Sequence, residues 1–235
     1  MSPWTLQPED LDAASGSVGG DADHAPADTG RRLWVVLTLL LVGGVLFGRL
    51  WWLAAETTRA AGLDRAAVAV GVQVMERPLA LASVDVALEL PPAANQPAQA
   101  VLGSLLASND VVLVNYWATW CPPCLQELAS LVRLGQALRG RKVAILAVSY
   151  DDDWAAQQAA LLEHAGERQP AGIVWARDPQ GQGGDVAQMM RTRMGTEKLP
   201  ETWVVRRGEI LGRFVGAQRW DRPEMVRYLD QVAAR

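Results

Sequence analysis

The fold is decided by the stretch VVLVNYWATWCPPC, which occupies residues 111–124. Its first half, Val111 to Trp117, is an apolar run with the length of a buried strand, and a helical pattern follows it. Cys121 and Cys124 are the only cysteines of the 235-residue chain, and they stand two residues apart where strand and helix meet. A disulfide across two residues closes a small ring that can open and re-form without unfolding the chain. The pair therefore predicts a redox centre.

The position of the pair at the start of a helix predicts different roles for the two sulfurs. A helix directs its unpaired N–H groups and the positive end of its dipole at the first sulfur, which lowers the pKa of that thiol. We therefore expect Cys121 to be the attacking thiolate and Cys124, one turn further along, to be the resolving thiol. Pro122 and Pro123 lack backbone donors and stiffen the ring, so they should tune its reduction potential.

Two other interpretations of the cysteines are weak. A structural zinc site usually needs four ligands, whereas this chain offers one cysteine pair and two distant histidines, His24 and His164. A purely structural disulfide gains most when it closes a long loop, and this one closes almost none. We therefore expect no metal ion and no cofactor other than the redox-active Cys121–Cys124 disulfide itself.

The charge of the chain is acidic and unevenly distributed. The formal net charge of −4 and the pI near 5.3 give no nucleic-acid-binding signature. Residues 1–30 contain six acidic residues and no lysine or arginine. Such a segment buries too little apolar surface to offset its chain entropy, so we expect residues 1–30 to be a disordered acidic tail.

Residues 31–55 predict a membrane anchor. Arg31 and Arg32 precede sixteen uncharged residues, and extension of this helix to Ala55 includes Arg49. The extended helix would be about 34 Å long, enough to cross a hydrocarbon core of about 30 Å. Arg49 can snorkel to the interface, where two tryptophans at 51 and 52 would form an aromatic belt.

The alternatives to an uncleaved anchor are a cleaved signal peptide and a buried core helix. Thirty residues come first, and only Leu53-Ala54-Ala55 suggests a cleavage site, which favours the anchor. The double arginine beside an unbroken apolar run argues against a core helix. The positive-inside rule places Arg31 and Arg32 in the cytoplasm, and it places the residues beyond 55 in the periplasm or its equivalent.

Residues 56–104 predict a linker and an N-terminal extension. Apolar and polar residues alternate in parts of Val68–Val74 and Leu79–Leu90, which predicts short strands there. Pro91–Pro97 has the composition of a turn or linker.

Residues 105–235 predict an α/β domain, a sheet with helices on both faces, because strand and helix patterns alternate along them. About 130 residues are enough for one independent core. We predict strands at 111–117, 142–149, 172–176, 202–206 and 209–215, and helices at 121–139, 153–165, 184–193 and 222–234.

Two segments of this domain resemble one known family. Residues 114–124 resemble the active-site segment of membrane-tethered thioredoxin-fold proteins of the TlpA/ResA/CcmG type, where the usual string is close to V-N-F-W-A-x-W-C-x-P-C. Residues 199–205, LPETWVV, resemble the cis-proline loop and the following strand of that family, and the likeness covers about residues 105–234. The resemblance implies a thioredoxin-like fold, a β-hairpin before its core, and thiol-disulfide exchange outside the cytoplasm.

The resemblance also implies residues that surround the cysteines. Pro200 would be a cis-proline packed against the disulfide, and Leu199 would present backbone groups to a partner chain as an added strand. From the residues alone, an ordinary trans proline at the start of a strand is equally acceptable. Trp120 and Trp117 would shield the sulfurs, although core packing explains Trp117 equally well.

Acidic residues near the cysteines are implied in the same way. Members of the family commonly have an acid just beyond the strand that ends here at Ser149, and Asp152 is the best match among residues 151–153. A solvated helix N-terminus explains these acids equally well. Glu127, one turn beyond Cys124, resembles a recurrent glutamate of the family, but it can also be a plain first-turn carboxylate.

The functional prediction is a membrane-anchored reductase of extracytoplasmic protein disulfides. Pro200-Glu201-Thr202 is closest to the members that act in cytochrome c maturation, so apocytochrome c is the expected substrate. A reductant in an oxidising compartment needs a supply of electrons, which implies a membrane donor of the DsbD/CcdA type. A thiol oxidant or isomerase of the same fold, or a tethered module without catalysis, remain as alternatives.

Overall fold

The computed structural model describes residues 29–92, 99–181 and 183–235. The chain divides into two compact units, Met1–Ala54 and Ala55–Arg235, and each is described by itself. The disorder predicted for residues 1–30 concerns a segment that, up to residue 28, lies outside the described residues. Most of the turn or linker predicted at Pro91–Pro97 lies outside them as well.

A long helix, α1 (Thr29–Val70), begins in the first unit and continues into the second. Every residue from 31 to 54 is exposed. The segment Arg31–Val70 has a mean hydropathy of 2.2 in its apolar part, and it is long and apolar enough to cross a membrane. Helix α1 is therefore a candidate membrane span. It continues past the predicted end at Ala55 because the following residues are rich in alanine, the strongest helix former.

Gly71 ends α1 within the stretch Val68–Val74, where the sequence predicts a strand. Its φ of +78° is left-handed, and its N–H donates to the Val68 carbonyl at 3.1 Å, as in a glycine C-cap. Ala67 and Val70 are buried in the core of the second unit. Since burial at 67 and 70 follows a helical period, the predicted strand is wrong up to residue 70, and β1 (Gln73–Pro78) follows the glycine.

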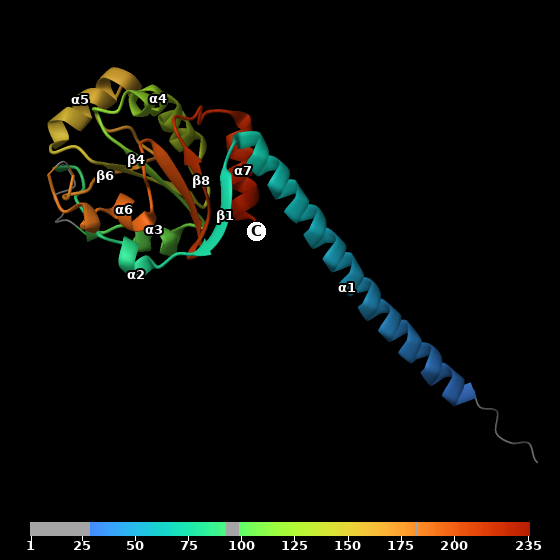
Figure 1. Ribbon diagram of the computed structural model, residues 1–235. Helices are drawn as coiled ribbons and strands as arrows, with labels where there is room; N and C mark the ends of the chain where they lie inside the picture. The colour runs from blue at the N-terminus through green and yellow to red at the C-terminus, as the bar shows by residue number, and fades with distance from the viewer. Residues whose placement is uncertain (1–28, 93–98, 182) are drawn as a thin grey trace, which may run out of the picture. The chain divides into compact units, whose positions relative to one another are not determined.

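The second unit is built on a six-stranded mixed sheet with the order β1-β8-β7-β4-β5-β6 (Figure 1). Strand β4 lies inside the sheet, parallel to β5 and antiparallel to β7. All seven of its residues are buried, as the apolar run predicts. Besides β1, the strands of this sheet are β4 (Val111–Trp117), β5 (Val143–Ser149), β6 (Val174–Arg177), β7 (Glu201–Arg206) and β8 (Glu209–Val215).

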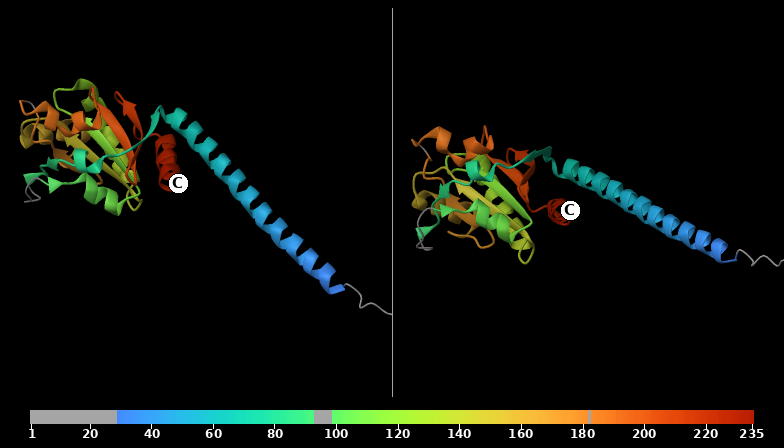
Figure 2. Two further views of the ribbon diagram at one scale, coloured as in Figure 1. Left: turned by 60° about the horizontal axis from the view of Figure 1, so that its bottom comes forward. Right: turned by 90° about the horizontal axis from the view of Figure 1, so that it is seen from below.

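Helices cover both faces of this sheet, as predicted (Figures 1 and 2). The strand register places Asn115, Thr202 and Phe214 on one face, and the Phe214 ring contacts Trp220 and Tyr228 at centroid distances of 5.1 and 6.3 Å. Helices α4, α5 and α7 pack on that face, whereas α2, α3 and α6 lie on the other. Their bounds are α2 (Leu81–Val84), α3 (Leu102–Ser108), α4 (Pro122–Ala137), α5 (Trp154–Ala165), α6 (Met190–Met194) and α7 (Pro223–Ala233).

The helix predicted at 184–193 is shorter than expected. A 3-10 helix, η2 (Val186–Gln188), comes first, and the five-residue α6 follows. Met189 between them has an extended backbone, with φ −60° and ψ 135°, which interrupts the helix. The left-handed Gly195, with φ +86°, then ends α6.

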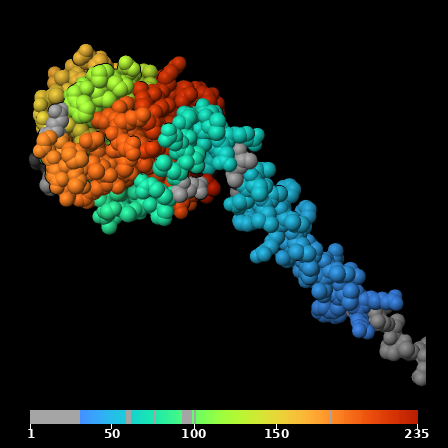
Figure 3. Space-filling model, viewed as in Figure 1, coloured from blue at the N-terminus to red at the C-terminus, as the bar shows by residue number. Residues whose placement is uncertain are grey.

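Residues 73–108 contribute to the same sheet and to its cover. Strand β1 pairs with β8 as the edge of the sheet, and in Figure 3 this teal part of the chain lies on the surface beside the red C-terminal part. A short antiparallel pair of consecutive strands also lies before the core, as the implied β-hairpin requires. The strands β2 (Ala87–Leu88) and β3 (Gln99–Ala100) pair with each other over two residues only.

Helix α4 packs closely on the segment that leads into β6. A Cβ on Gly172 would lie 2.7 Å from the Gly135 carbonyl oxygen, and one on Gly135 would lie 2.8 Å from Cγ1 of Ile173. Only a residue without a side chain fits either position. The contact holds the helix that starts at the cysteines against the sheet.

We predict that Gly172→Ala destabilises the protein more than Gly140→Ala. Both glycines have a left-handed φ, +93° and +77°, but nothing lies within 4 Å of a Cβ on Gly140. Each variant should lose about 1 kcal/mol to backbone strain, and Gly172→Ala should lose about 2 kcal/mol more to the clash. Urea unfolding of the full chain in detergent, followed by tryptophan fluorescence, measures the difference. Equal losses would show that the helix can move away at no cost.

Candidate active site

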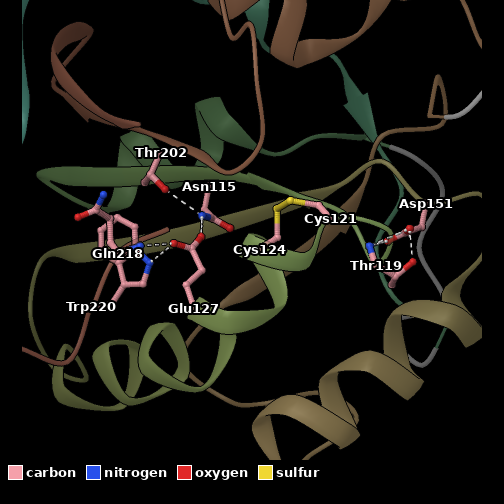
Figure 4. Close-up of a disulfide and its surroundings, with 9 residues drawn as sticks. All are labelled: Asn115, Thr119, Cys121, Cys124, Glu127, Asp151, Thr202, Gln218 and Trp220. Atoms are coloured by element: carbon pink, nitrogen blue, oxygen red, sulfur yellow. Dashed lines mark hydrogen bonds between the residues drawn. A yellow bond between two sulfur atoms is a disulfide. The ribbon is translucent and has the colours of Figure 1, made fainter. Parts of the chain in front are cut away.

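The two cysteines lie where β4 gives way to α4, and they form a disulfide (Figure 4). Cys121 is the N-cap residue of α4, with an extended backbone, and Pro122 and Pro123 occupy the first two helical positions. Proline suits these positions because the N–H groups there have no partner within the helix. The N–H groups of Cys124 and Leu125 both donate to the Cys121 carbonyl, at 3.0 and 3.2 Å, so the ring is part of the first helical turn.

The two sulfur-bearing residues differ in exposure. Cys121 is 5 % exposed and Cys124 is fully buried. Trp120 is 53 % exposed and stands beside the accessible cysteine. Trp117 is buried, and its ring packs edge-on against Trp175 at 5.9 Å. The core-packing interpretation of Trp117 therefore applies, and Trp120 remains the expected shield of the disulfide.

The peptide bond between Leu199 and Pro200 is cis, as the resemblance implies. The antiparallel register pairs Tyr116 with Glu201, so Pro200 falls beside the last residue of β4, where the chain turns into the cysteines. Pro200 is buried and Leu199 is half-buried. The Pro200 carbonyl accepts a hydrogen bond from Gly216 at 2.9 Å, which fixes the loop to the end of β8. The docking role of Leu199 stays a prediction.

Glu127 is a buried carboxylate with three hydrogen-bond donors, and it is not a plain surface residue of the first turn. It is 1 % exposed. Its Oε1 accepts from the Asn115 side-chain amide at 2.9 Å, and its Oε2 accepts from the Gln218 backbone N–H and the Trp220 indole N–H, both at 2.9 Å (Figure 4). Asn115 also donates to Thr202 at 2.8 Å. The Glu127 carboxylate thus joins α4 to β4 and to the loop after β8, and Asn115 extends the network to β7.

Burial raises the pKa of Glu127 to about 7, although its three hydrogen bonds each act to lower it. Removal of a carboxylate from water disfavours its charged form, and this cost exceeds the stabilisation from the donors. A group with a pKa near neutrality can exchange a proton at physiological pH. Glu127 lies on α4 one turn beyond Cys124.

The acid that contacts the active-site turn is Asp151, and the prediction of Asp152 is wrong in this respect. Asp151 is 3 % exposed, and its carboxylate accepts hydrogen bonds from the Thr119 backbone N–H at 3.0 Å and the Thr119 hydroxyl at 2.6 Å (Figure 4). Asp152 is exposed. Asp153 caps α5 and accepts from the Ala156 N–H at 2.8 Å, so the helix-cap interpretation holds for that residue.

The sequence analysis missed Asn115, Thr119 and Trp220 as site residues. Asn115 left a signal, because it is the one amide in an otherwise apolar and aromatic strand, and a buried amide needs partners. Trp220 left none, because a hydrogen bond across 93 residues has no local pattern. Among the described residues, no group of three or more His, Cys, Asp and Glu side chains is placed to hold a metal ion.

Comparison with known proteins identifies the family of this chain and several relatives. Residues 87–212, more than half of the chain, match the AhpC/TSA family. The chain is 32% identical over 113 residues to the thiol:disulfide interchange protein DsbE homolog of Paracoccus denitrificans, which covers 48% of this chain and 54% of that protein. It is 31% identical over 127 residues to the thiol:disulfide interchange protein DsbE of Allochromatium vinosum, which covers 51% and 62%.

A solved structure shows the fold. The structure named for a thiol:disulfide interchange protein DsbE of Chlorobium tepidum superposes with a TM-score of 0.52 at 20% identity, and the match covers 68% of this chain and 99% of that one. The fold is therefore thioredoxin-like, as predicted. The chain spans about half the length of the curated relatives it matches, such as 54% of the Paracoccus protein.

We predict that Glu127 makes the stability of the oxidised protein fall with rising pH. Its pKa is raised from 4.5 to about 7 by folding, so between these values the folded state binds more protons than the unfolded state. The free energy of unfolding should then decrease by about 3 kcal/mol across this window and level off above it. Glu127→Gln should remove this decrease.

Urea unfolding of the full chain in detergent at several pH values measures this effect. The cysteines stay out of the measurement because they are joined in a disulfide. Glu163→Gln is the matched control, since the Glu163 side chain is 77% exposed. A Glu127→Gln variant that keeps the pH dependence of the parent would contradict the prediction.

Proposed function

The chain belongs to the AhpC/TSA family, and from this premise and the geometry of the disulfide we propose that it is a membrane-anchored thiol-disulfide oxidoreductase. One observation carries the proposal: a disulfide at the first turn of a helix joins Cys121, a residue that is 5 % exposed, to Cys124, which is fully buried. This asymmetry is what sequential attack and resolution require.

In the first step the Cys121 thiolate attacks one sulfur of a substrate disulfide. The Cys121–substrate bond forms, the substrate S–S bond breaks, and the second substrate sulfur leaves as a thiolate. The N-terminal end of α4 favours the anionic form of Cys121, because its positive dipole end and unpaired N–H groups meet the sulfur there. Cys124 cannot start the reaction, since it is buried.

In the second step Cys124 attacks the Cys121 sulfur. The Cys121–Cys124 bond forms, the bond to the substrate breaks, and the substrate leaves as a dithiol that has gained two electrons. Cys124 must first lose its proton in a buried site. Glu127, with a pKa of about 7 and one turn away on α4, is the group we assign as the acceptor of that proton.

Substrate docking is assigned to the cis-proline loop. The half-buried Leu199 offers backbone groups to an extended peptide beside the disulfide, and such strand addition gives affinity through main-chain hydrogen bonds. Trp120, exposed next to Cys121, adds an apolar surface for the same peptide.

The finer proposal is a reductant that faces the periplasm. Helix α1 supplies a candidate anchor, and the paired arginines at its start favour a cytoplasmic N-terminus. Two relatives are named thiol:disulfide interchange protein DsbE or a homolog of it. These names support the exchange of protein disulfides. The likeness of the Pro200-Glu201-Thr202 loop to members that act in cytochrome c maturation supports apocytochrome c as substrate, and a reductant in an oxidising compartment needs a membrane electron donor, for which we propose the DsbD/CcdA type. The redox-active disulfide is the only cofactor in this proposal.

We predict that Cys124→Ala traps substrates and that Cys121→Ala does not. Without Cys124 the Cys121–substrate disulfide has no internal thiol to resolve it, whereas a lone buried Cys124 cannot reach a substrate. Both variants should reduce insulin no faster than the uncatalysed background. Non-reducing electrophoresis and mass spectrometry of the full chain with apocytochrome c detect the adduct.

The outcome separates the rival functions. Trapping of many unrelated proteins but not of apocytochrome c would reject the finer substrate and keep the oxidoreductase. Insulin reduction by the parent chain and by Cys121→Ala that both stay at the uncatalysed background would leave only a tethered, non-catalytic module.

We also predict a reducing potential for the Cys121–Cys124 couple. As a reductant, the protein should lie closer to about −270 mV than to about −120 mV, the ends of the range for thioredoxin-like proteins. Equilibration of the full chain with glutathione buffers, read by alkylation of the free thiols, measures the potential. A value near the upper end would reverse the direction of electron flow and favour the oxidant.

A further inference from the structure

Arg177, the last residue of β6, links the N-terminal segment to the active-site turn. A backbone bridge joins it to Glu89, with N–H to carbonyl distances of 2.9 and 2.8 Å. The side chains pair as well: Nε of Arg177 donates to Oε2 of Glu89 at 3.0 Å, and Nη2 contacts the same oxygen. The Arg177 side chain is 18% exposed, so water weakens this pair less than it would a surface pair.

The other side of the guanidinium faces the loop that follows β5. Nη1 of Arg177 donates to the backbone carbonyls of Asp151, at 3.4 Å, and of Asp152. A guanidinium presents several donors in a fixed plane, so an arginine already held by a carboxylate can also fix a second partner. Arg177 is thereby fixed between Glu89 and the 151–152 loop.

The same loop holds the residue that precedes the active-site tryptophan. Both carboxylate oxygens of Asp151 accept from the Thr119 N–H, at 3.0 and 3.1 Å, and one also accepts from the Thr119 hydroxyl at 2.6 Å. Ser149 donates to the other oxygen at 2.6 Å. Thr119 lies two residues before Cys121, so the Asp151 carboxylate sets the course of the chain into the attacking cysteine.

We propose that Arg177 and Glu89 are positioning residues for Cys121, which they reach through Asp151 and Thr119. This inference rests on the proposed function, because it concerns the same thiol. It assigns a role to the segment before α3. Glu89 in that segment holds Arg177, and Arg177 in turn fixes the position of the negatively charged Asp151 carboxylate at the active-site turn. Like charges disfavour the thiolate, so the fixed Asp151 carboxylate opposes the effect of the α4 N-terminus on Cys121.

The titratable groups on the elements around Cys121 include Tyr116 on β4, Glu127 on α4, Tyr150 and Asp151 after β5, Asp178 after β6 and Glu201 at the start of β7. Glu201 is 1% exposed and pairs with Arg213 at 2.8 Å. Glu127 is held by Asn115 and the loop after β8. The contacts of Arg177 described above lead to Asp151, so its influence should pass through that residue.

The test is the titration of Cys121 in the full chain, in detergent, with Cys124→Ala as background so that one thiol reacts. The rate of alkylation by iodoacetamide against pH gives the pKa of Cys121. Arg177→Lys keeps the positive charge but lacks the planar fork that holds Glu89 and the 151–152 loop together, so it should loosen the Asp151 carboxylate and lower this pKa by about half a unit. Asp151→Asn should lower it further. In the Asp151→Asn background, Arg177→Lys should add no further shift.

Arg207→Lys is the matched control, since Arg207 pairs with Asp110 at 2.9 Å at the opposite end of β4 and β7. It should leave the pKa of Cys121 unchanged. Glu89→Gln keeps the backbone bridge and removes the ion pair, so it carries the test if Arg177→Lys does not fold. Its shift should have the same direction.

The proposal is wrong if the parent and the variant at 177 (or at 89, should that one be needed) give the same Cys121 titration. It is also wrong if the shift is equally large with and without Asp151. Failure of the parent chain to reduce insulin would reject the proposed function, whereas the titration judges the positioning role by itself.

Discussion

Burial of β4 on both faces constrains everything around the disulfide. The strand runs parallel to β5 and antiparallel to β7, and each of its seven residues is buried. The C-terminal end of β4 therefore has little conformational freedom, and this fixes the position of the two cysteines that follow it. Because β4 is buried, the side-chain amide of Asn115 needs hydrogen-bond partners within the protein. The Asn115 side-chain amide donates to Glu127 and to Thr202, and these bonds connect the strand to the cysteine helix and to β7, the strand that follows Pro200.

The same network buries the carboxylate of Glu127, which is energetically unfavourable. Burial of a carboxylate is unfavourable unless donors compensate, and here three donors compensate in part, which leaves the pKa near neutrality. A more polar pocket would return the carboxyl to its ordinary pKa, and a drier one would keep it protonated. The position of Glu127 between these limits makes a proton acceptor beside Cys124 chemically reasonable.

The sequence predicts the features that local pattern encodes. An apolar run, a cysteine pair and alternating periods were enough for β4, the start of α4 and the order of the later strands. The cis-proline followed only from the resemblance of the LPET segment to a known family. Pairing over long distances left no such pattern. The bond between β1 and β8, the link from Glu89 to Arg177 across 88 residues and the choice of Asp151 over Asp152 depend on which segments meet. The alternation of apolar and polar residues shows which face of a strand is buried, but it does not show which strand lies next to it.

In the proposed mechanism the two sulfurs are served by different carboxylates, which enter from different elements. Glu127 shares α4 with Cys124 and is fixed by β4 and the loop after β8, whereas Asp151 comes from the end of β5 and holds the turn before Cys121. No hydrogen bond links the two carboxylates directly among the described residues. The attacking thiol and the resolving thiol can therefore be tuned separately, because a change at one carboxylate leaves the contacts of the other in place. An exchange reaction gains from this separation, since its first step needs an anion at Cys121 and its second needs a proton removed from Cys124.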